Sequence, residues 1–178
     1  DALKKITLGS GVEVFGVYSY LADGVSFNDA KLALYQCINL EEIAVSEGNT
    51  FYRAVDGVLY GKSVCGEEYS DGAVLYSVPS ARVQTELTLP DSVKIMLPYA
   101  FQYQKSVTSL TLNEGLENIG KGAFYSSSSI TSLHLPSTVR QIGAGILLSS
   151  KIQSFSIAEE NPVFSSDGNL IYNGNELV

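Results

Sequence analysis

The chain has 178 residues, of which 45% are hydrophobic and 17% are charged, and its formal net charge is -8. This composition excludes a disordered tail, and no run approaches the roughly 20 apolar residues that a membrane-spanning helix needs. The excess of acidic residues argues against nucleic acid as the main partner. We therefore expect one folded domain over residues 1–178, in which the 16 glycines and 11 tyrosines favour turns and half-buried strands.

The first predicted strand covers residues 3–8, where three leucine or isoleucine residues are spaced by three and then by two positions. The end of this triplet alternates as a short strand does, with its outer two residues facing the core. An insertion around residues 21–31 follows, marked by the turn signal Asp23-Gly24. The same triplet then returns and predicts a second strand over residues 40–45.

Two later segments, 46–83 and 161–178, share a different pattern. In each, an asparagine (Asn49, Asn161) precedes a tyrosine (Tyr60, Tyr172) at the same spacing, and Asp-Gly or Asn-Gly pairs divide the segment. These pairs are typical of hairpin turns, so we expect two β-hairpin insertions that project from the rest of the chain. The Asp-Gly pairs also resemble fragments of calcium loops, but turn chemistry explains them better because the further ligands of such a loop are missing.

A repeat dominates the second half of the chain. Leucines at positions 89, 112 and 135 recur every 23 residues, and Ile157 follows 22 residues later. The triplets that end at these positions predict strands at 84–89, 107–112, 130–135 and 152–157. One such unit cannot bury its apolar residues alone, so stability requires stacking of neighbouring units. The sequence therefore predicts a mostly β solenoid with one short parallel strand for each repeat of 22–23 residues.

The unit Leu-x-x-Ile/Leu-x-Leu-(Pro)-x-x-Val-x-x-Ile-Gly-x-x-Ala-Phe, most complete over residues 110–135, resembles the BspA-like leucine-rich repeat family. The resemblance implies a right-handed superhelix with turns or short helices on its convex side. Cys37 stands where that family commonly has a cysteine. The position three residues after each strand carries no asparagine, in contrast to repeats of the ribonuclease-inhibitor type, so we expect no asparagine ladder.

Catalytic and metal-binding signals are weak. Cys37 and Cys65 are expected to be buried free thiols, because a small disulfide scaffold would carry more cysteines. The single histidine, His134, has no second histidine or nearby cysteine with which to form a zinc site or a nucleophilic pair. No catalytic motif is recognisable, so we expect neither an enzyme nor a cofactor.

The candidate binding residues point outward from the predicted strands, on the exposed face of the sheet. They are mostly small and polar, and they comprise Glu42, Glu86, Thr88, Ser109, Thr111, Ser132, His134 and Ser156. Serine and threonine at these positions are explained by strand propensity and solubility alone. The alternative is an extended concave surface for a protein or glycan ligand, which solenoids commonly provide.

Two other groups of residues allow more than one interpretation. Acidic residues gather in the first half of the chain, at 41, 42, 47, 67, 68 and 71, and form either a solvated rim or a site for a basic partner. The tyrosines Tyr35, Tyr103 and Tyr125 follow the apolar pairs near the convex turns. They are either wedges between repeats or anchors for a ligand.

The leading functional hypothesis is a non-enzymatic binding or adhesion module of a bacterial surface or secreted protein. Its location, and a host or bacterial surface protein as partner, are implied by the resemblance alone. The alternative is a structural spacer that presents another domain. Both ends of the chain lack a cap, so we expect a fragment of a longer protein, whose secretion signal and anchor lie outside this chain.

Overall fold

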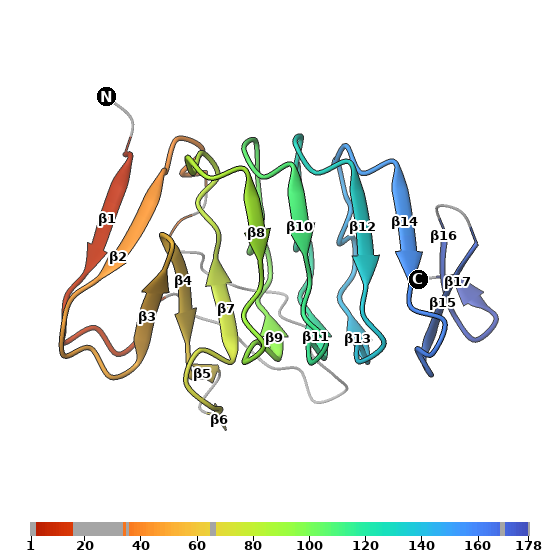
Figure 1. Cartoon of the computed structure of the whole chain (residues 1–178), viewed down its shortest axis with the longest axis horizontal. Coiled ribbons are helices and arrows are strands. Elements are labelled where there is room, and N and C mark those ends of the chain that lie inside the picture. Colours follow the sequence, from red (N-terminus) through yellow and green to blue (C-terminus); the bar gives the residue numbers. More distant parts are fainter. Residues whose placement is uncertain (1–2, 16–33, 35, 65–66, 168–169, 178) are drawn as a thin grey trace.

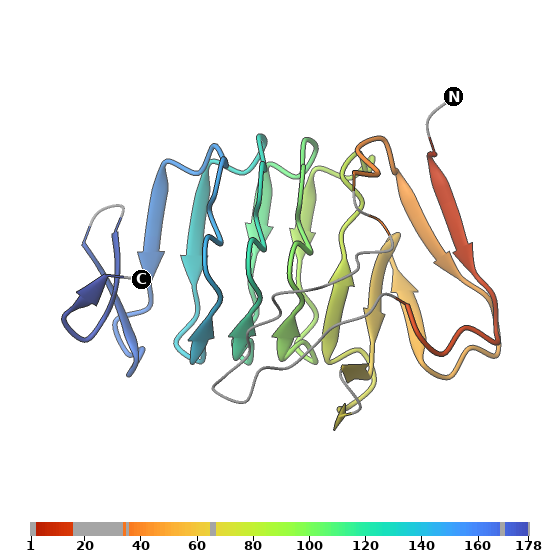
Figure 2. The same ribbon diagram turned by 180° about the vertical axis from the view of Figure 1, so that it is seen from behind.

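The computed structural model describes residues 3–15, 34, 36–64, 67–167 and 170–177. The insertion around residues 21–31, Tyr35 and Cys65 lie outside the described residues. Within the described part there are strands and turns but no helix, and the chain winds into an elongated solenoid (Figures 1 and 2). The expected β solenoid of leucine-rich repeats is therefore confirmed, with turns on its convex side.

One strand from each repeat lies on the front of the solenoid in Figure 1. These strands are β1 (Lys5–Leu8), β2 (Glu42–Val45), β8 (Glu86–Thr88), β10 (Ser109–Thr111), β12 (Ser132–Leu135) and β14 (Ser154–Ile157). Each falls within one of the six triplets of the sequence. They pair in parallel, β1 with β2, β8 with β10 and β12 with β14, and the registers follow the repeat, so that Leu110 lies opposite Leu87.

A second sheet of six strands, in the order β13-β11-β9-β7-β4-β3, lies behind the first. Its strands are β3 (Tyr52–Val55), β4 (Val58–Gly61), β7 (Val74–Ser77), β9 (Ile95–Met96), β11 (Asn118–Ile119) and β13 (Gln141–Ile142). The hairpin β3–β4 and the β4–β7 pair are antiparallel, whereas β7, β9, β11 and β13 continue in parallel.

The hairpin predicted within residues 46–83 forms, but it does not project from the solenoid. All four residues of β4 are buried, and this strand joins the second sheet through β7. Three consecutive apolar residues, Val58, Leu59 and Tyr60, make both faces of β4 suitable for burial, so the hairpin becomes part of the core. Only the short pair β5 (Ser63–Val64) and β6 (Glu67–Glu68) forms a sheet of its own in this segment.

The second predicted hairpin forms a separate three-stranded sheet at the C-terminal end (Figures 1 and 2). Its strands are β15 (Phe164–Asp167), β16 (Leu170–Asn173) and β17 (Glu176–Leu177), all antiparallel. Phe164 and Ile171 are each 6% exposed and extend the core of the repeats. This sheet therefore covers the apolar end of the last repeat.

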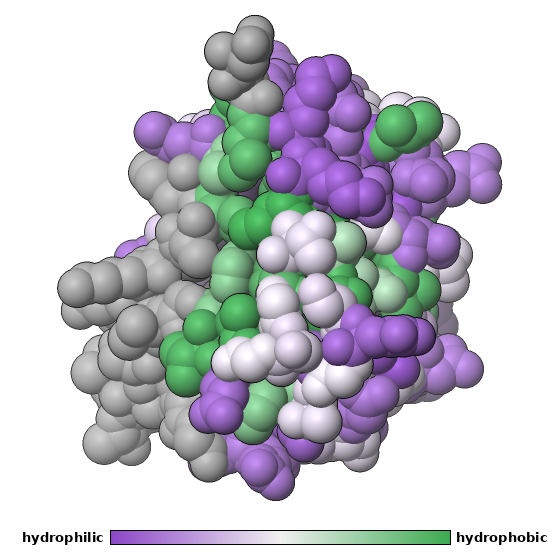
Figure 3. Space-filling model, turned by 90° about the vertical axis from the view of Figure 1, so that its left-hand side faces the viewer, coloured by the Kyte–Doolittle hydropathy of each residue, from purple (hydrophilic) through white to green (hydrophobic). Residues whose placement is uncertain are grey.

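The opposite end of the solenoid has no comparable cover among the described residues. Figure 3 looks onto this end and shows hydrophobic surface between hydrophilic groups. Among the described residues, strand β1 pairs with β2 alone, and its neighbourhood includes the exposed side chains of Leu3 and Val14. The free edge of a strand beside apolar surface is a ready site for another strand.

Two asparagines, Asn49 and Asn161, join neighbouring turns. Each stands one residue after the position that carries asparagine in repeats of the ribonuclease-inhibitor type, where no asparagine ladder was expected. Asn49 donates from Nδ2 to the carbonyls of Gly9 and Val12, at 2.9 and 3.0 Å, and its Oδ1 accepts from the N–H groups of residues 51 and 52. Asn161 makes the same four bonds, donating to the carbonyls of residues 136 and 139. Each asparagine thereby fixes the entry to one hairpin on the turn of the preceding repeat.

Candidate ligand-binding face

The front sheet carries the candidate binding residues on strands β8, β10, β12 and β14. Burial alternates along these strands: in β12, Leu133 and Leu135 are buried, whereas Ser132 and His134 are exposed. The exposed residues of these two strand pairs form a polar surface, which we call the Ser/Thr face. It consists of Glu86, Thr88, Ser109, Thr111, Ser132, His134, Ser154 and Ser156.

Strand pairing places these side chains in lateral rows. Thr111 lies opposite Thr88, and His134 lies opposite Ser156. The Nδ1 atom of His134 is 2.8 Å from Oγ of Ser156, which orients the imidazole along the row. The backbone below is held by ladder bonds, including 3.0 Å from the Leu89 N–H to the Thr111 carbonyl. The face thus consists of two hydrogen-bonded strand pairs, β8–β10 and β12–β14, and among the described residues no strand pairing joins β10 to β12.

Glu42, which was predicted to share this face, lies apart from the other seven predicted residues. Its carboxylate pairs with Lys5 at 2.7 Å on the β1–β2 ladder. The turn at Asp56 and Gly57 separates β2 from β8, because the Gly57 carbonyl accepts from the N–H of Ile43 at 2.9 Å. The hairpin insertion therefore interrupts the front sheet at this point.

Arg82 bridges strand β8 and the turn at Asp56 and Gly57, and no sequence motif singled it out. Its guanidinium donates to the carbonyls of Glu86 and Asp56, at 3.0 and 3.2 Å, and the residue is only 3% exposed. Burial lowers the pKa of Arg82, while nearby Asp56 and Tyr60 act in the opposite direction. The available signal was a single cation within the otherwise uncharged stretch from Gly72 to Thr85.

Tyr60 lies beside this arginine, and its burial leads us to expect a lower free energy of unfolding at high pH. Burial raises the pKa of Tyr60 from 10.0 to about 12, although Arg82 and Arg53 oppose the shift. Because the folded state favours the neutral phenol, its contribution is complete below pH 10 and is lost as the pH rises toward 12. That loss is about 2–3 kcal/mol.

The change that tests this expectation is Tyr60→Phe, measured by urea unfolding at pH 8 and at pH 12. The variant should lose less free energy of unfolding between these two pH values than the unchanged protein does. An identical loss in both proteins would contradict the assignment to Tyr60.

The acidic residues of the first half are mostly paired with neighbours. Glu41 bonds Lys4 at 2.7 Å, and Asp71 bonds Arg53 at 3.3 Å. Glu67 accepts from the hydroxyl of Tyr69 at 2.8 Å. These contacts favour the interpretation as a solvated rim. The neighbouring groups partly neutralise the carboxylates, which weakens their electrostatic attraction for a basic partner, and exposed ion pairs of this kind add little stability.

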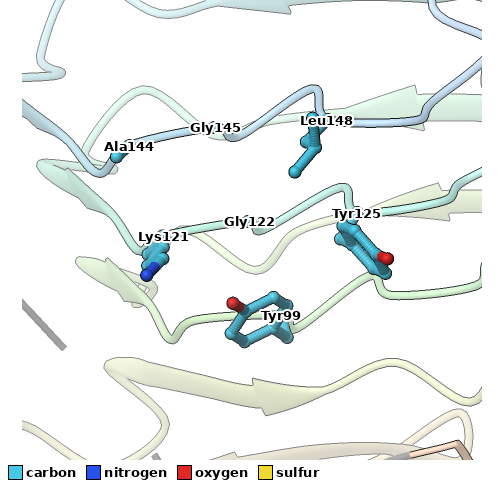
Figure 4. Close-up of a pocket in the computed structure, with 7 residues that line it drawn as sticks. All are labelled: Tyr99, Lys121, Gly122, Tyr125, Ala144, Gly145 and Leu148. Carbon is cyan, nitrogen blue, oxygen red and sulfur yellow. The ribbon is translucent and has the colours of Figure 1, made fainter. Parts of the chain in front are cut away.

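The tyrosines of the convex side pack against one another. The Tyr125 ring meets Tyr99 and Tyr103 edge-on, with ring centroids 6.0 and 5.7 Å apart. Tyr99 has a φ of 60° where the next two repeats place Gly122 and Gly145 in the same left-handed conformation. Its ring lies against Gly122 and helps to enclose a hollow of about 370 Å³, shown in Figure 4. The contacts support a wedge role for Tyr103 and Tyr125, and the hollow leaves room for a ligand group.

Of the two cysteines, the structure describes Cys37. Cys37 is a free cysteine that is half-buried rather than fully buried, and it packs against the N-terminal part of the core. Among the residues that the structure describes, no three His, Cys, Asp or Glu side chains gather in a way that could hold a metal ion. In the same part of the chain, no helix has the length and apolar character that a membrane crossing requires.

Comparison with known proteins adds a family and three solved structures. The family model described as "BspA type Leucine rich repeat region (6 copies)" matches residues 81–173. A leucine-rich repeat protein from Eubacterium ventriosum is 29% identical with a TM-score of 0.66, and the match covers 86% of this chain and 36% of that one. No curated protein matches the sequence.

Two further structures are similar in fold. The pneumococcal vaccine antigen PcpA is 24% identical, with a TM-score of 0.64, over 89% of this chain and 40% of that protein. A leucine-rich cell surface protein from Faecalibacterium prausnitzii is 22% identical, with a TM-score of 0.59, over 89% of this chain and 43% of its own. The chain thus spans less than half of each of the three proteins.

Proposed function

Because the chain belongs to the BspA-type leucine-rich repeat family, we propose that it is a non-enzymatic binding or adhesion module of a bacterial surface or secreted protein. Its partner is a protein of the host or of another bacterial surface, or a glycan, held on the Ser/Thr face. The similarity to a protein described as a cell surface protein supports the location.

The observation that carries the proposal is the arrangement of hydroxyl groups on the Ser/Thr face. Serine and threonine hydroxyls each donate and accept hydrogen bonds, so they complement both peptide groups and sugar hydroxyls. Their side chains are short and lose little entropy when a partner covers them. Eight exposed side chains on the strand pairs β8–β10 and β12–β14 therefore present many hydrogen-bonding groups.

The charge around this face favours a partner that is neutral at its centre. Seven of its eight side chains are serine, threonine or histidine, and Glu86 lies at the edge nearest Arg82. The ion pairs Lys4–Glu41 and Lys5–Glu42 lie beyond the interruption at Gly57. A ligand that lies across β10 and β12 therefore meets hydroxyl groups first.

The substitution Thr111→Arg tests the face at its centre. A bulky cation there should weaken binding of the isolated domain by at least ~10-fold, because it displaces a ligand that lies flat on the sheet. The measurement is surface plasmon resonance against immobilised extracellular-matrix proteins and glycans. Thr50→Arg is the matched control, since Thr50 is exposed on a turn away from the face, and it should change the affinity by less than ~2-fold.

The outcomes also separate this function from that of a spacer, which remains the second candidate because the chain spans only part of longer proteins. Equal weakening by both variants would assign binding to another surface. No binding to any member of the panel, together with unchanged bacterial adhesion in the Thr111→Arg strain, would favour the spacer.

A further inference from the structure

The hollow of about 370 Å³ on the convex side of the solenoid has not been given a role so far (Figure 4). Its lining comes from three successive repeats: from Tyr99, from the turn at residues 121–125 and from the turn at residues 144–148. The side chains of Tyr99 and Leu148 stand on opposite sides of it, so the hollow lies between described turns and not beyond the last of them. A volume of this size is within the range of pockets that bind small molecules.

The three turns have the same backbone conformation at the position of Tyr99. The φ angle is 60° at Tyr99, 58° at Gly122 and 62° at Gly145. Equivalent hydrogen bonds also join the turns. The N–H of Tyr99 donates to the carbonyl of Lys121 at 3.1 Å, and one repeat later the N–H of Gly122 donates to the carbonyl of Ala144 at the same distance. A side chain at this position therefore leaves each turn in the same direction.

An aromatic ring covers the first of the two glycines but not the second. A Cβ atom at Gly122 would lie 2.5 Å from Cε1 of Tyr99, so the Tyr99 ring rests on this glycine, which is buried. Position 122 is itself a glycine and sends no ring onward to Gly145. A Cβ atom at Gly145 would meet, among the described residues, Leu148 alone, at 3.6 Å and beyond, and Gly145 is exposed. The hollow thus occupies the place that a tyrosine ring fills one repeat earlier.

We propose that the hollow binds a small molecule that carries a six-membered aromatic ring, in the place equivalent to the ring of Tyr99. The repeat supplies the expected contacts. The Tyr99 ring meets Tyr125 edge-on, with centroids 6.0 Å apart, and Leu148 stands 23 residues after Tyr125, at the equivalent position. A ring over Gly145 therefore packs against Leu148 as Tyr99 packs against Tyr125, and the tyrosines that line the hollow add aromatic contacts.

Polar groups beside the hollow suit a ring with a hydroxyl substituent. Figure 4 shows the Lys121 ammonium and the Tyr99 hydroxyl on one side of the hollow and the Tyr125 hydroxyl on the other. A phenol, which both donates and accepts, can bond such groups while its ring stays on the glycine floor. The site lies on the convex turns rather than on the front strands, so it operates whether or not the Ser/Thr face binds a ligand.

The first test is a titration of the ¹⁵N-labelled domain with p-cresol, followed by NMR. The amide signals of Gly122, Tyr125 and Gly145 should shift and saturate, with a Kd on the order of 1 mM. The matched control is 4-methylcyclohexanol, which has the same heavy atoms but a ring that is not flat, and it should bind at least ~5-fold more weakly. Equal affinity for the two compounds, or shifts scattered over the surface without saturation, would overturn the proposal. Shifts of the same amides on raising the protein concentration alone would assign the hollow to a second copy and would equally overturn it.

The second test compares two variants in the same titration. Leu148→Glu should weaken p-cresol binding at least ~5-fold, because it replaces an apolar wall by a carboxylate, and the fold should persist since Leu148 is 60% exposed. Val83→Glu, at a residue 78% exposed elsewhere, should change the Kd by less than ~2-fold. Equal effects of the two variants would overturn the proposal.

A third measurement identifies the source of the ring. The tripeptide Gly-Tyr-Gly carries the same phenol on a peptide backbone and should bind no more tightly than p-cresol does. Binding at least ~10-fold tighter would assign the hollow to a side chain of a protein partner, and tighter binding of methyl glucoside would make it a sugar site. Either result would overturn the assignment to a small aromatic molecule.

Discussion

Replacing Phe124 by alanine is expected to lower the free energy of unfolding by about 4 kcal/mol. The side chain is fully buried in the middle of the array and stacks on Phe101. Backbone bonds hold its repeat to both neighbours, including 2.9 Å from the Phe124 N–H to the Ile146 carbonyl. Because these ladders keep the repeats at a fixed spacing, the cavity left by the ring cannot collapse fully.

Thermal and urea unfolding would measure this loss, which corresponds to a decrease in Tm of roughly 8–16 °C for a chain of this size. Leu147→Ala is the matched control, since Leu147 occupies the equivalent position in the last repeat and is only half-buried. We expect that variant to lose about 1–2 kcal/mol. An equal loss in the two variants would contradict a layered core in which the central repeat is enclosed on both sides.

Replacing Gly120 by alanine is expected to cost about 3 kcal/mol. A Cβ atom at this position would lie 2.4 Å from the backbone nitrogen of Pro98 and 2.7 Å from the carbonyl carbon of Leu97. These are backbone atoms of the preceding repeat, so relief requires the two repeats to separate. A Cβ atom at Gly143 would likewise lie 2.3 Å from the backbone nitrogen of Lys121, which explains why the Ile-Gly pair recurs with the period of the solenoid.

Gly9→Ala provides the control for this experiment. Gly9 also lies in a turn after a front strand, but a Cβ atom there would meet nothing within 4 Å. Its substitution should change the free energy of unfolding by less than about 0.5 kcal/mol. Unchanged stability in Gly120→Ala would contradict the close approach of neighbouring repeats at this position.

The periodic part of the fold could be predicted well from the sequence. The triplets at residues 84–89, 107–112 and 130–135 each contain an observed front strand, because the same apolar pattern must face the same core in every layer. Seven of the eight predicted site residues lie together for the same reason. A position that points outward in one repeat points outward in the next, so Thr111 and His134 fall on one surface.

The irregular part could not be predicted in the same way. The sequence marks turns in residues 46–83, but nothing local shows that β4 will pair with β7 and enter the second sheet. Glu42 fits the outward pattern of β2, yet the turn at Gly57 separates it from Glu86. Arg82 becomes important only because this turn brings the Asp56 carbonyl within 3.2 Å of its guanidinium.

The amino-acid pattern thus specifies the layers: short strands every 22–23 residues, glycines where layers touch, and a polar outward face. Such features repeat, so each copy reinforces the interpretation of the others. The interruption beside β2 and the asparagine links at Asn49 and Asn161 are visible only in three dimensions. Each arises where the repetition is broken, since there a residue's partners are set by distant segments rather than by the next copy of the same unit.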